Sequence, residues 1–158
     1  MVRTGIGFDS HRLTPGRPLI LGGVPLPHDH GLQGHSDADA LAHALCDALL
    51  GAVADGDIGQ HFPDTDPQWK GADSMTLLAL VVARLTRTGW RIVNTDATIL
   101  AEAPKLAPHI LAIRTRLSEV MEISLSQVSV KAKTNEGMDA VGRREGIAVL
   151  ATALVEHI

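Results

Sequence analysis

The chain has 158 residues, of which 45% are hydrophobic and 20% are charged, a composition that predicts one globular domain with a substantial core. A formal net charge of −4 and an aromatic content of only 3% argue against a nucleic-acid partner, which requires a basic surface and often base-stacking rings. The single cysteine fits a reducing compartment, and no apolar run approaches the roughly 20 residues of a membrane span, so we expect a cytoplasmic protein without a membrane partner.

The first half of the chain alternates between strand and helix signals. Residues 3–11 have the alternation of a strand, and residues 19–27 predict two short strands about a Gly-Gly turn. Ser36, followed three residues later by Asp39, has the pattern of a helix N-cap. Apolar residues at helical spacing follow it, so we predict a helix over residues 37–54 with Ser36 as its N-cap.

The second half continues this alternation. Helices are predicted over residues 74–88 and 108–121, and strands over residues 91–101, 127–133 and 146–158. The last segment is apolar on both faces, which fits a buried strand or a helix, and we assign it to a strand. The stretches 28–36 and 55–73 are expected to be loops, and a loop as long as the second is usually functional or mobile. Strands interleaved with helices predict the α+β class, here a single-domain α/β sandwich with a mixed sheet and helices on one face.

Asp9 and His11 lie on one face of the first predicted strand, together with two glycines that leave room for a ligand. His43 lies on the first predicted helix, on the side opposite its apolar stripe. If this helix packs beside the strand, a carboxylate and two imidazoles converge, a set that suits Zn²⁺ and leaves a fourth position open. Asp47, one turn beyond His43, is expected to orient its ring, with Asp39 as a rival. A chance D-x-H pair and a solvated histidine remain the alternative interpretation.

Two loops contain further candidates for anion and polyol binding. Ser36 and the backbone N–H groups after it form a predicted helix N-terminus, which attracts phosphate, unless Ser36 is only a cap. Asp57, Asp64 and Asp66 could accept hydrogen bonds from a polyol or simply cap turns.

Charged side chains also cluster between residues 131 and 146. Lys131 and Lys133 share the polar face of their predicted strand, Glu136 supplies a carboxylate suited to Mg²⁺, and Arg143 and Arg144 can bind phosphate. An anion pocket and an ordinary solvated turn are both consistent with this composition.

Taken together, these stretches resemble the 2-C-methyl-D-erythritol 2,4-cyclodiphosphate synthase family of the non-mevalonate isoprenoid pathway. The similarity covers nearly the whole chain, in order, through GIGFDSHRL, LGGVPLP, GHSDADALAHALCDALLGA, GDIGQHFPDTDPQWKGADS, AEAPKLAPHI and KAKTNEGM…GRREGIA. The resemblance implies one synthase domain over residues 1–158. It also implies a homotrimer around a central sheet-lined axis, with active sites between neighbouring subunits.

The resemblance implies a phosphorus–oxygen lyase whose substrate is 4-diphosphocytidyl-2-C-methyl-D-erythritol 2-phosphate. The 2-phosphate attacks the β-phosphorus, CMP leaves, and 2-C-methyl-D-erythritol 2,4-cyclodiphosphate remains. Positioning and charge stabilisation carry most of such a phosphoryl transfer. Two alternative functions are consistent with the same residues: a zinc phosphohydrolase that uses a metal-bound hydroxide, and a non-catalytic, metal-stabilised trimeric module.

By the same resemblance, one Zn²⁺ per subunit is held by Asp9, His11 and His43, and a second ion, Mg²⁺ or Mn²⁺, by Glu136. The residues that act on the phosphates are His35, Thr134 and Lys133. The substrate-binding residues are Ser36, Asp57, Ile58, Gly59, Phe62, Pro63, Asp64, Thr65, Asp66, Ala101, Glu102, Ala103, Pro104, Lys105, Leu106, Ala107, Asn135 and Arg143.

Within this set, residues 57–66 match the erythritol-binding loop and residues 101–107 match the cytidine pocket. The chain departs from the family pattern at two positions, because Ala140 and Arg144 stand where many members have Phe and Gly. In the family, this region is associated with a central cavity near the trimer axis and with binding of an isoprenoid diphosphate there.

Overall fold

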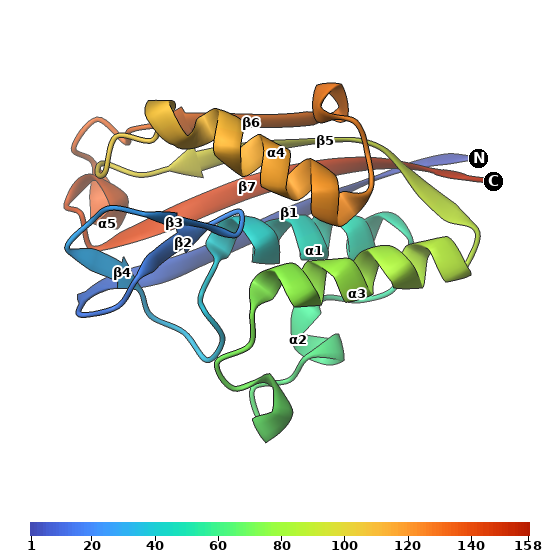
Figure 1. Cartoon of the computed structure of the whole chain (residues 1–158), viewed down its shortest axis with the longest axis horizontal. Helices are drawn as coiled ribbons and strands as arrows, with labels where there is room; N and C mark the ends of the chain where they lie inside the picture. Colours follow the sequence, from blue (N-terminus) through green and yellow to red (C-terminus); the bar gives the residue numbers. More distant parts are fainter.

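The computed structural model describes the whole chain, residues 1–158, as a mixed sheet with helices packed on one face (Figure 1). The strands are β1 (Val2–Pro15), β2 (Leu19–Leu21), β3 (Val24–Leu26), β4 (His30–Leu32), β5 (Trp90–Leu100), β6 (Val128–Lys133) and β7 (Gly146–His157). The helices are α1 (Ala40–Ala52), α2 (Ile58–His61), α3 (Ser74–Arg87), α4 (Ile110–Met121) and α5 (Asp139–Gly142), with 3-10 turns η1 (Pro67–Trp69), η2 (Ala107–His109) and η3 (Leu125–Gln127). None of the helices is both long and apolar enough to cross a lipid bilayer.

The central sheet has five strands in the order β4-β1-β7-β5-β6. Strand β7 is antiparallel to β1 on one side and to β5 on the other, and β6 is parallel to β5. The sheet is therefore mixed, and helices α1, α3 and α4 lie on the same side of it (Figure 1). The predicted α+β class, with helices on one face, is confirmed, and so is the assignment of the C-terminal apolar segment to a strand.

Helix α1 lies directly against strand β1 because two glycines leave no side chain between them. A Cβ atom at Gly7 would lie 1.8 Å from the carbonyl oxygen of Ala44, and one at Gly5 would lie 2.0 Å from that of Ala48. Only glycine fits such a contact between backbones. Nearly every residue of α1 is buried, because the sheet covers one side of the helix and α3 lies on another. The close contact brings the side chains of β1 and α1 together, as the sequence predicts.

The opposite face of the sheet has no helix over it and is partly apolar. Ile6 is 69% exposed, Phe8 is 56% exposed and Leu150 on the neighbouring strand is 42% exposed. Phe8 and Leu150 are opposite each other in the β1–β7 register. The outer face therefore exposes an apolar cluster of Ile6, Phe8 and Leu150 among polar residues such as Thr152.

The first helix starts later than the sequence predicts, and Ser36 is not its N-cap. The hydroxyl of Ser36 accepts the N–H of Ala38 at 3.1 Å, and Ala38 has φ 59°, a left-handed conformation that an α-helix cannot contain. Asp39 is the N-cap, because its Oδ1 accepts the N–H of Ala42 at 3.0 Å. The same buried carboxylate binds the N–H groups of Gly22 and Gly23, which fixes the β2–β3 turn against the start of α1.

Two predicted loops contain regular structure. The stretch 28–36 includes β4, which pairs with the end of β1, and the stretch 55–73 includes α2 and η1. Both short helices begin at an aspartate: Asp57 Oδ1 accepts the N–H of Gln60 at 2.9 Å, and Asp66 Oδ1 accepts the N–H of Gln68 at 3.0 Å. The interpretation of these two aspartates as caps is therefore confirmed.

Candidate metal centre and active site

Asp9, His11 and His43 converge at the junction of β1 and α1. The Oδ2 atom of Asp9 lies 2.8 Å from His11 Nε2 and 3.1 Å from His43 Nδ1, and the two nitrogens are 3.3 Å apart. The sequence prediction that these side chains meet is confirmed. The pair on β1 points toward α1 because it shares the strand face of Gly5 and Gly7.

Hydrogen bonding fixes which nitrogen of His11 faces the centre. Its Nδ1 lies 2.8 Å from the carbonyl oxygen of Gln33, which can only accept, so Nδ1 carries the proton. The Nε2 atom then directs a lone pair at the carboxylate of Asp9, and two acceptors at this distance require a shared cation. A metal ion or a proton can take that place. Burial acts to lower the pKa of His11, but Asp9 outweighs it and raises the pKa above its usual value.

Asp9 responds in the opposite direction. Burial acts to raise the pKa of Asp9, but its hydrogen bonds to His11 and His43 outweigh burial and lower the pKa below its usual value. The centre therefore favours an ionised carboxylate next to positive charge.

The geometry of the three ligand atoms fits a metal ion. A tetrahedral ion bound at about 2.1 Å keeps its ligand atoms about 3.4 Å apart, so the observed triangle needs only a slight expansion to admit one. One carboxylate oxygen and two imidazole nitrogens form a ligand set that zinc accepts, and three protein ligands leave a fourth position open.

Two serines surround the outer nitrogen of His43. Its Nε2 lies 2.8 Å from Ser74 Oγ, at the first residue of α3, and 3.1 Å from Ser36 Oγ. Ser74 in turn donates its hydroxyl to Asp37. Neither Ser74 nor Asp37 is among the predicted site residues, because nothing in the sequence places α3 beside this histidine.

The structure does not give Asp47 the expected contact with His43. Asp47 Oδ1 instead accepts the N–H of Ile58 at 2.7 Å and ties α2 to α1. Asp39, the rival candidate, is occupied as the cap of α1. Burial raises the pKa of Asp47 above its usual value.

A cavity of about 280 Å³ opens beside the three ligands. It is lined by Asp9, His11, Gly34, His35, Ser36, His43, Ile58, Gly59, Phe62, Asp64, Trp69 and Leu77. His35 Nδ1 lies 3.7 Å from the Oδ1 atom of Asp64. Phe62 packs edge-on against Trp69 with ring centroids 4.9 Å apart and forms an apolar wall. Trp69 and Leu77 are not among the predicted site residues, because an apolar lining residue has no chemical signature in the sequence.

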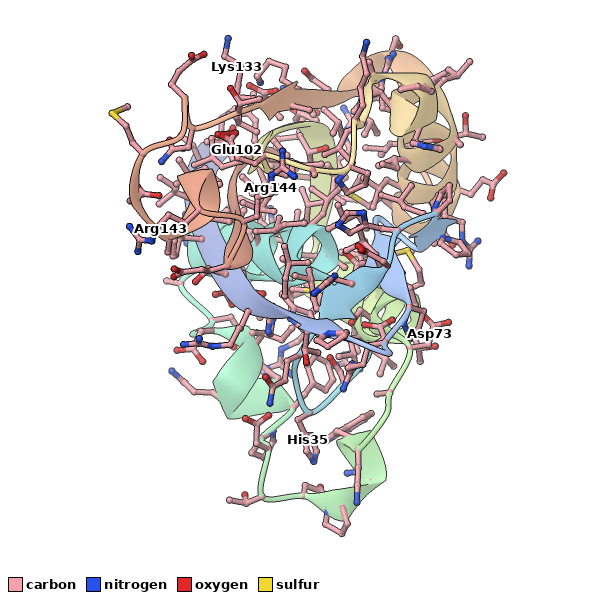
Figure 2. All side chains as sticks on the ribbon, turned by 90° about the vertical axis from the view of Figure 1, so that its left-hand side faces the viewer. His35, Asp73, Glu102, Lys133, Arg143 and Arg144 are labelled. Atoms are coloured by element: carbon pink, nitrogen blue, oxygen red, sulfur yellow. The ribbon has the colours of Figure 1, made fainter.

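Residues 101–107 and 133–136 form a second group outside this cavity, whereas Asp57, Pro63, Thr65 and Asp66 belong to the segment around α2 and η1 and do not line it. In Figure 2, Glu102 and Lys133 lie at the upper end of the molecule and His35 lies at the lower end. Glu102 accepts the N–H groups of Gly137 at 2.7 Å and Asn135 at 3.3 Å, so residues 101–107 lie against the loop that contains Thr134 and Glu136. No member of this second group lines the cavity at the metal centre.

Near this second group, Ala140 lines another hollow, which is also lined by His11 of the metal centre and by Asn135. Arg143 Nε donates to Glu145 Oε1 at 2.8 Å. Glu145 and Ala140 line a cavity of about 490 Å³ beside Phe8 on the outer side of the sheet. Within one chain, Glu102 and Lys133 therefore lie away from the cavity that contains His35 and the three ligands.

The fold and the centre together define a single-domain α+β protein with three side chains that could hold a metal ion beside a cavity. The chain belongs to the YgbB family, whose sequence profile matches residues 2–156. A relative from Dechloromonas aromatica is 58% identical over 99% of this chain and 98% of its own length, and one from Syntrophomonas wolfei is 55% identical over 99% of both. Both are named 2-C-methyl-D-erythritol 2,4-cyclodiphosphate synthase, and the predicted family is confirmed.

Solved structures agree with this assignment. The bifunctional IspDF protein of Campylobacter jejuni has a TM-score of 0.96 and 39% identity, covering 100% of this chain and 43% of that protein. A CDP-bound 2C-methyl-D-erythritol-2,4-cyclodiphosphate synthase has a TM-score of 0.91 and 39% identity, covering 98% of this chain and 100% of its own.

Proposed function

We propose that this chain catalyses the cyclisation of 4-diphosphocytidyl-2-C-methyl-D-erythritol 2-phosphate to 2-C-methyl-D-erythritol 2,4-cyclodiphosphate with release of CMP, as a phosphorus–oxygen lyase. The observation that carries the proposal is the open site of Asp9, His11 and His43 beside a cavity, in a chain more than half identical to relatives named for this product. The predicted location in the cytoplasm is part of the same proposal.

The two sets of residues would hold two metal ions. Asp9, His11 and His43 would hold Zn²⁺, and Glu136 would hold Mg²⁺ or Mn²⁺ on the substrate diphosphate. When bound, these ions supply Lewis-acid polarisation of the diphosphate and offset its charge.

The residues around the cavity would position the attacking phosphate and the polyol. His35 and Ser36 lie beside the centre, where an imidazole and a hydroxyl can hold the 2-phosphate near the β-phosphorus. Gly59 and Asp64 lie where they can contact the polyol, and the apolar wall of Phe62 and Trp69 excludes water from the reacting groups. The attacking phosphate is already an anion at neutral pH, so the residues mainly need to offset repulsion between phosphates.

The separation of the two groups supports a homotrimer in which neighbouring subunits complete each active site. Residues 101–107, Lys133, Thr134 and Glu136 would face the metal centre of the next subunit rather than their own. The exposed apolar face of the sheet offers the surface for such an assembly, because side chains as large as Phe8 are costly to leave in water.

The two alternatives have less support. A zinc phosphohydrolase would release free phosphate, and the relatives are named for a cyclic product instead. A purely structural zinc is ligated by four protein groups, whereas only three ligands meet here.

Phosphorus NMR of the protein with the cytidyl substrate and Mg²⁺ tests the proposal. The expected result is one equivalent of CMP and one of cyclic diphosphate. Release of inorganic phosphate would contradict the proposal and favour the phosphohydrolase.

His43→Ala supplies the matched test of the metal centre. We expect this variant to lose zinc and CMP release while far-UV circular dichroism shows the fold intact, because one of three ligands is gone. Near-normal turnover by the variant would show that the centre is assigned wrongly.

A further inference from the structure

Ser74 and Asp37 form a partly buried chain of hydrogen bonds that ends on His43. Ser74 is fully buried at the first residue of α3, and its Oγ lies 2.8 Å from His43 Nε2. The Ser74 hydroxyl donates to Asp37 Oδ1, and the Ser74 backbone N–H donates to the other oxygen at 3.0 Å. The N–H of Asp39 also donates to Asp37 Oδ1, at 3.1 Å. Each atom of this chain therefore has a defined partner.

The count of protons in this chain determines the tautomer of His43. An ionised carboxylate can only accept, and a serine hydroxyl has a single proton to give. Since Ser74 donates that proton to Asp37, its oxygen can only accept from His43 Nε2. The Nε2 atom must then carry the ring proton when zinc is bound, which leaves the lone pair of Nδ1 directed at Asp9 and His11.

We propose that Asp37 and Ser74 are positioning residues that hold the His43 ring in the orientation and tautomer required of a metal ligand. The inference rests on the proposed function only in that the site binds a metal. It follows from the direction of two hydrogen bonds and the burial of Ser74. Outer partners of this kind orient a ligating histidine and make it more basic.

Ser36 has a different place in the same cluster. Its Oγ accepts the N–H of Ala38 and lies 3.1 Å from His43 Nε2, but no carboxylate takes its proton. Ser36 also lines the cavity, whereas Ser74 does not. The two hydroxyl groups beside His43 Nε2 therefore have different roles. Ser74 orients the imidazole, and Ser36 remains available to a bound anion.

The change Ser74→Ala isolates the proposed role. It removes the nearer of the two oxygens beside His43 Nε2 and leaves the helix cap intact, because Asp73 still accepts the N–H of Met75 at 2.9 Å. Loss of such an outer partner typically weakens metal affinity about 10- to 100-fold. Ser36→Ala is the matched control, because it removes the other hydroxyl from the same nitrogen.

The test measures zinc affinity by competition with a chelator, with the thermal midpoint of the metal-free protein as a check on folding. We expect Ser74→Ala to bind zinc at least about tenfold more weakly than the wild type. Asp37→Asn places an amide N–H where Ser74 needs an acceptor, so it should also weaken binding. The double variant should be no weaker than Ser74→Ala, because both changes act through one chain. Ser36→Ala should bind zinc like the wild type.

Proton NMR of zinc-loaded protein supplies the second readout. The His43 Nε2–H should give a slowly exchanging, downfield signal in the wild type and in Ser36→Ala, and the signal should broaden in Ser74→Ala. Wild-type affinity in Ser74→Ala, or additive losses in the double variant, would overturn the inference while the metal centre stands. A wild-type protein that binds no zinc would overturn the metal centre and this inference together.

Discussion

The carboxylate of Glu102 accepts the backbone N–H of Gly137 at 2.7 Å, across 35 positions of sequence. Its other oxygen lies 3.3 Å from the N–H of Asn135. These two N–H groups flank Glu136, whose φ of 54° is left-handed. Glu102 thus holds the loop that would bind the second ion against the segment that would bind cytidine.

Glu102→Ala should therefore loosen both parts at once. We expect a higher KM for the cytidyl substrate and a higher Mg²⁺ requirement, because the loop loses both of its hydrogen bonds to this carboxylate. Steady-state kinetics at varied Mg²⁺ would measure both changes. Zinc content should not change, and Glu119→Ala on the exposed face of α4 serves as the control. Unchanged kinetics would show that the contact has no functional importance.

Lys133 is the next test of the second group. We expect Lys133→Ala to raise KM or lower kcat roughly tenfold or more through a lost phosphate contact, without altering zinc content. Lys131→Ala is a matched control on the same face of β6, where the lysine is paired with Asp96. If Lys133→Ala and Lys131→Ala had the same KM and kcat, Lys133 would have no specific role in the active site.

The contact between α1 and β1 predicts opposite effects at two glycines. Gly7→Ala should lower the free energy of unfolding by about 3 kcal/mol, because its Cβ would lie 1.8 Å from a backbone oxygen. Gly51→Ala on α1 should raise it by about 0.5–1 kcal/mol, since the new Cβ meets only Ile6 O at 3.9 Å and alanine favours a helix. Urea denaturation measures both values, and similar effects at the two sites would refute this packing.

The raised pKa of His11 predicts how the stability of the metal-free protein depends on pH. Asp9 favours the protonated imidazole in the folded state, so the folded state holds this proton more tightly than the unfolded state. The resulting stability is complete below the unfolded pKa of about 6.5 and is lost as the pH rises through the higher folded value. Denaturation in EDTA at a series of pH values measures this decline. His11→Gln should remove it, and a decline of equal size in that variant would assign it to another group.

Several features of this site follow from the sequence because they depend on local rules. Asp9 and His11 share a strand face by simple alternation, and two glycines on that face predict close contact with a helix. The position of His43 on that helix then predicts the metal centre. These features need no knowledge of distant packing.

Other features depend on contacts that local rules do not include. The left-handed conformation of Ala38 moves the N-cap of α1 to Asp39. An alanine gives no sequence signal for such a conformation. Ser74 resembles an ordinary first residue of a helix, and only the packing of α3 against α1 places it on His43. The separation of Lys133 and Glu102 from the metal centre likewise depends on the order of strands in the sheet.

X-ray diffraction at the zinc edge, from crystals of the zinc-loaded protein with CDP, tests the central claim most directly. We predict one anomalous peak at about 2.1 Å from Asp9 Oδ2, His11 Nε2 and His43 Nδ1, with an oxygen of the diphosphate in the fourth position. An ion ligated by four protein groups, or no peak beside these three side chains, would contradict the claim.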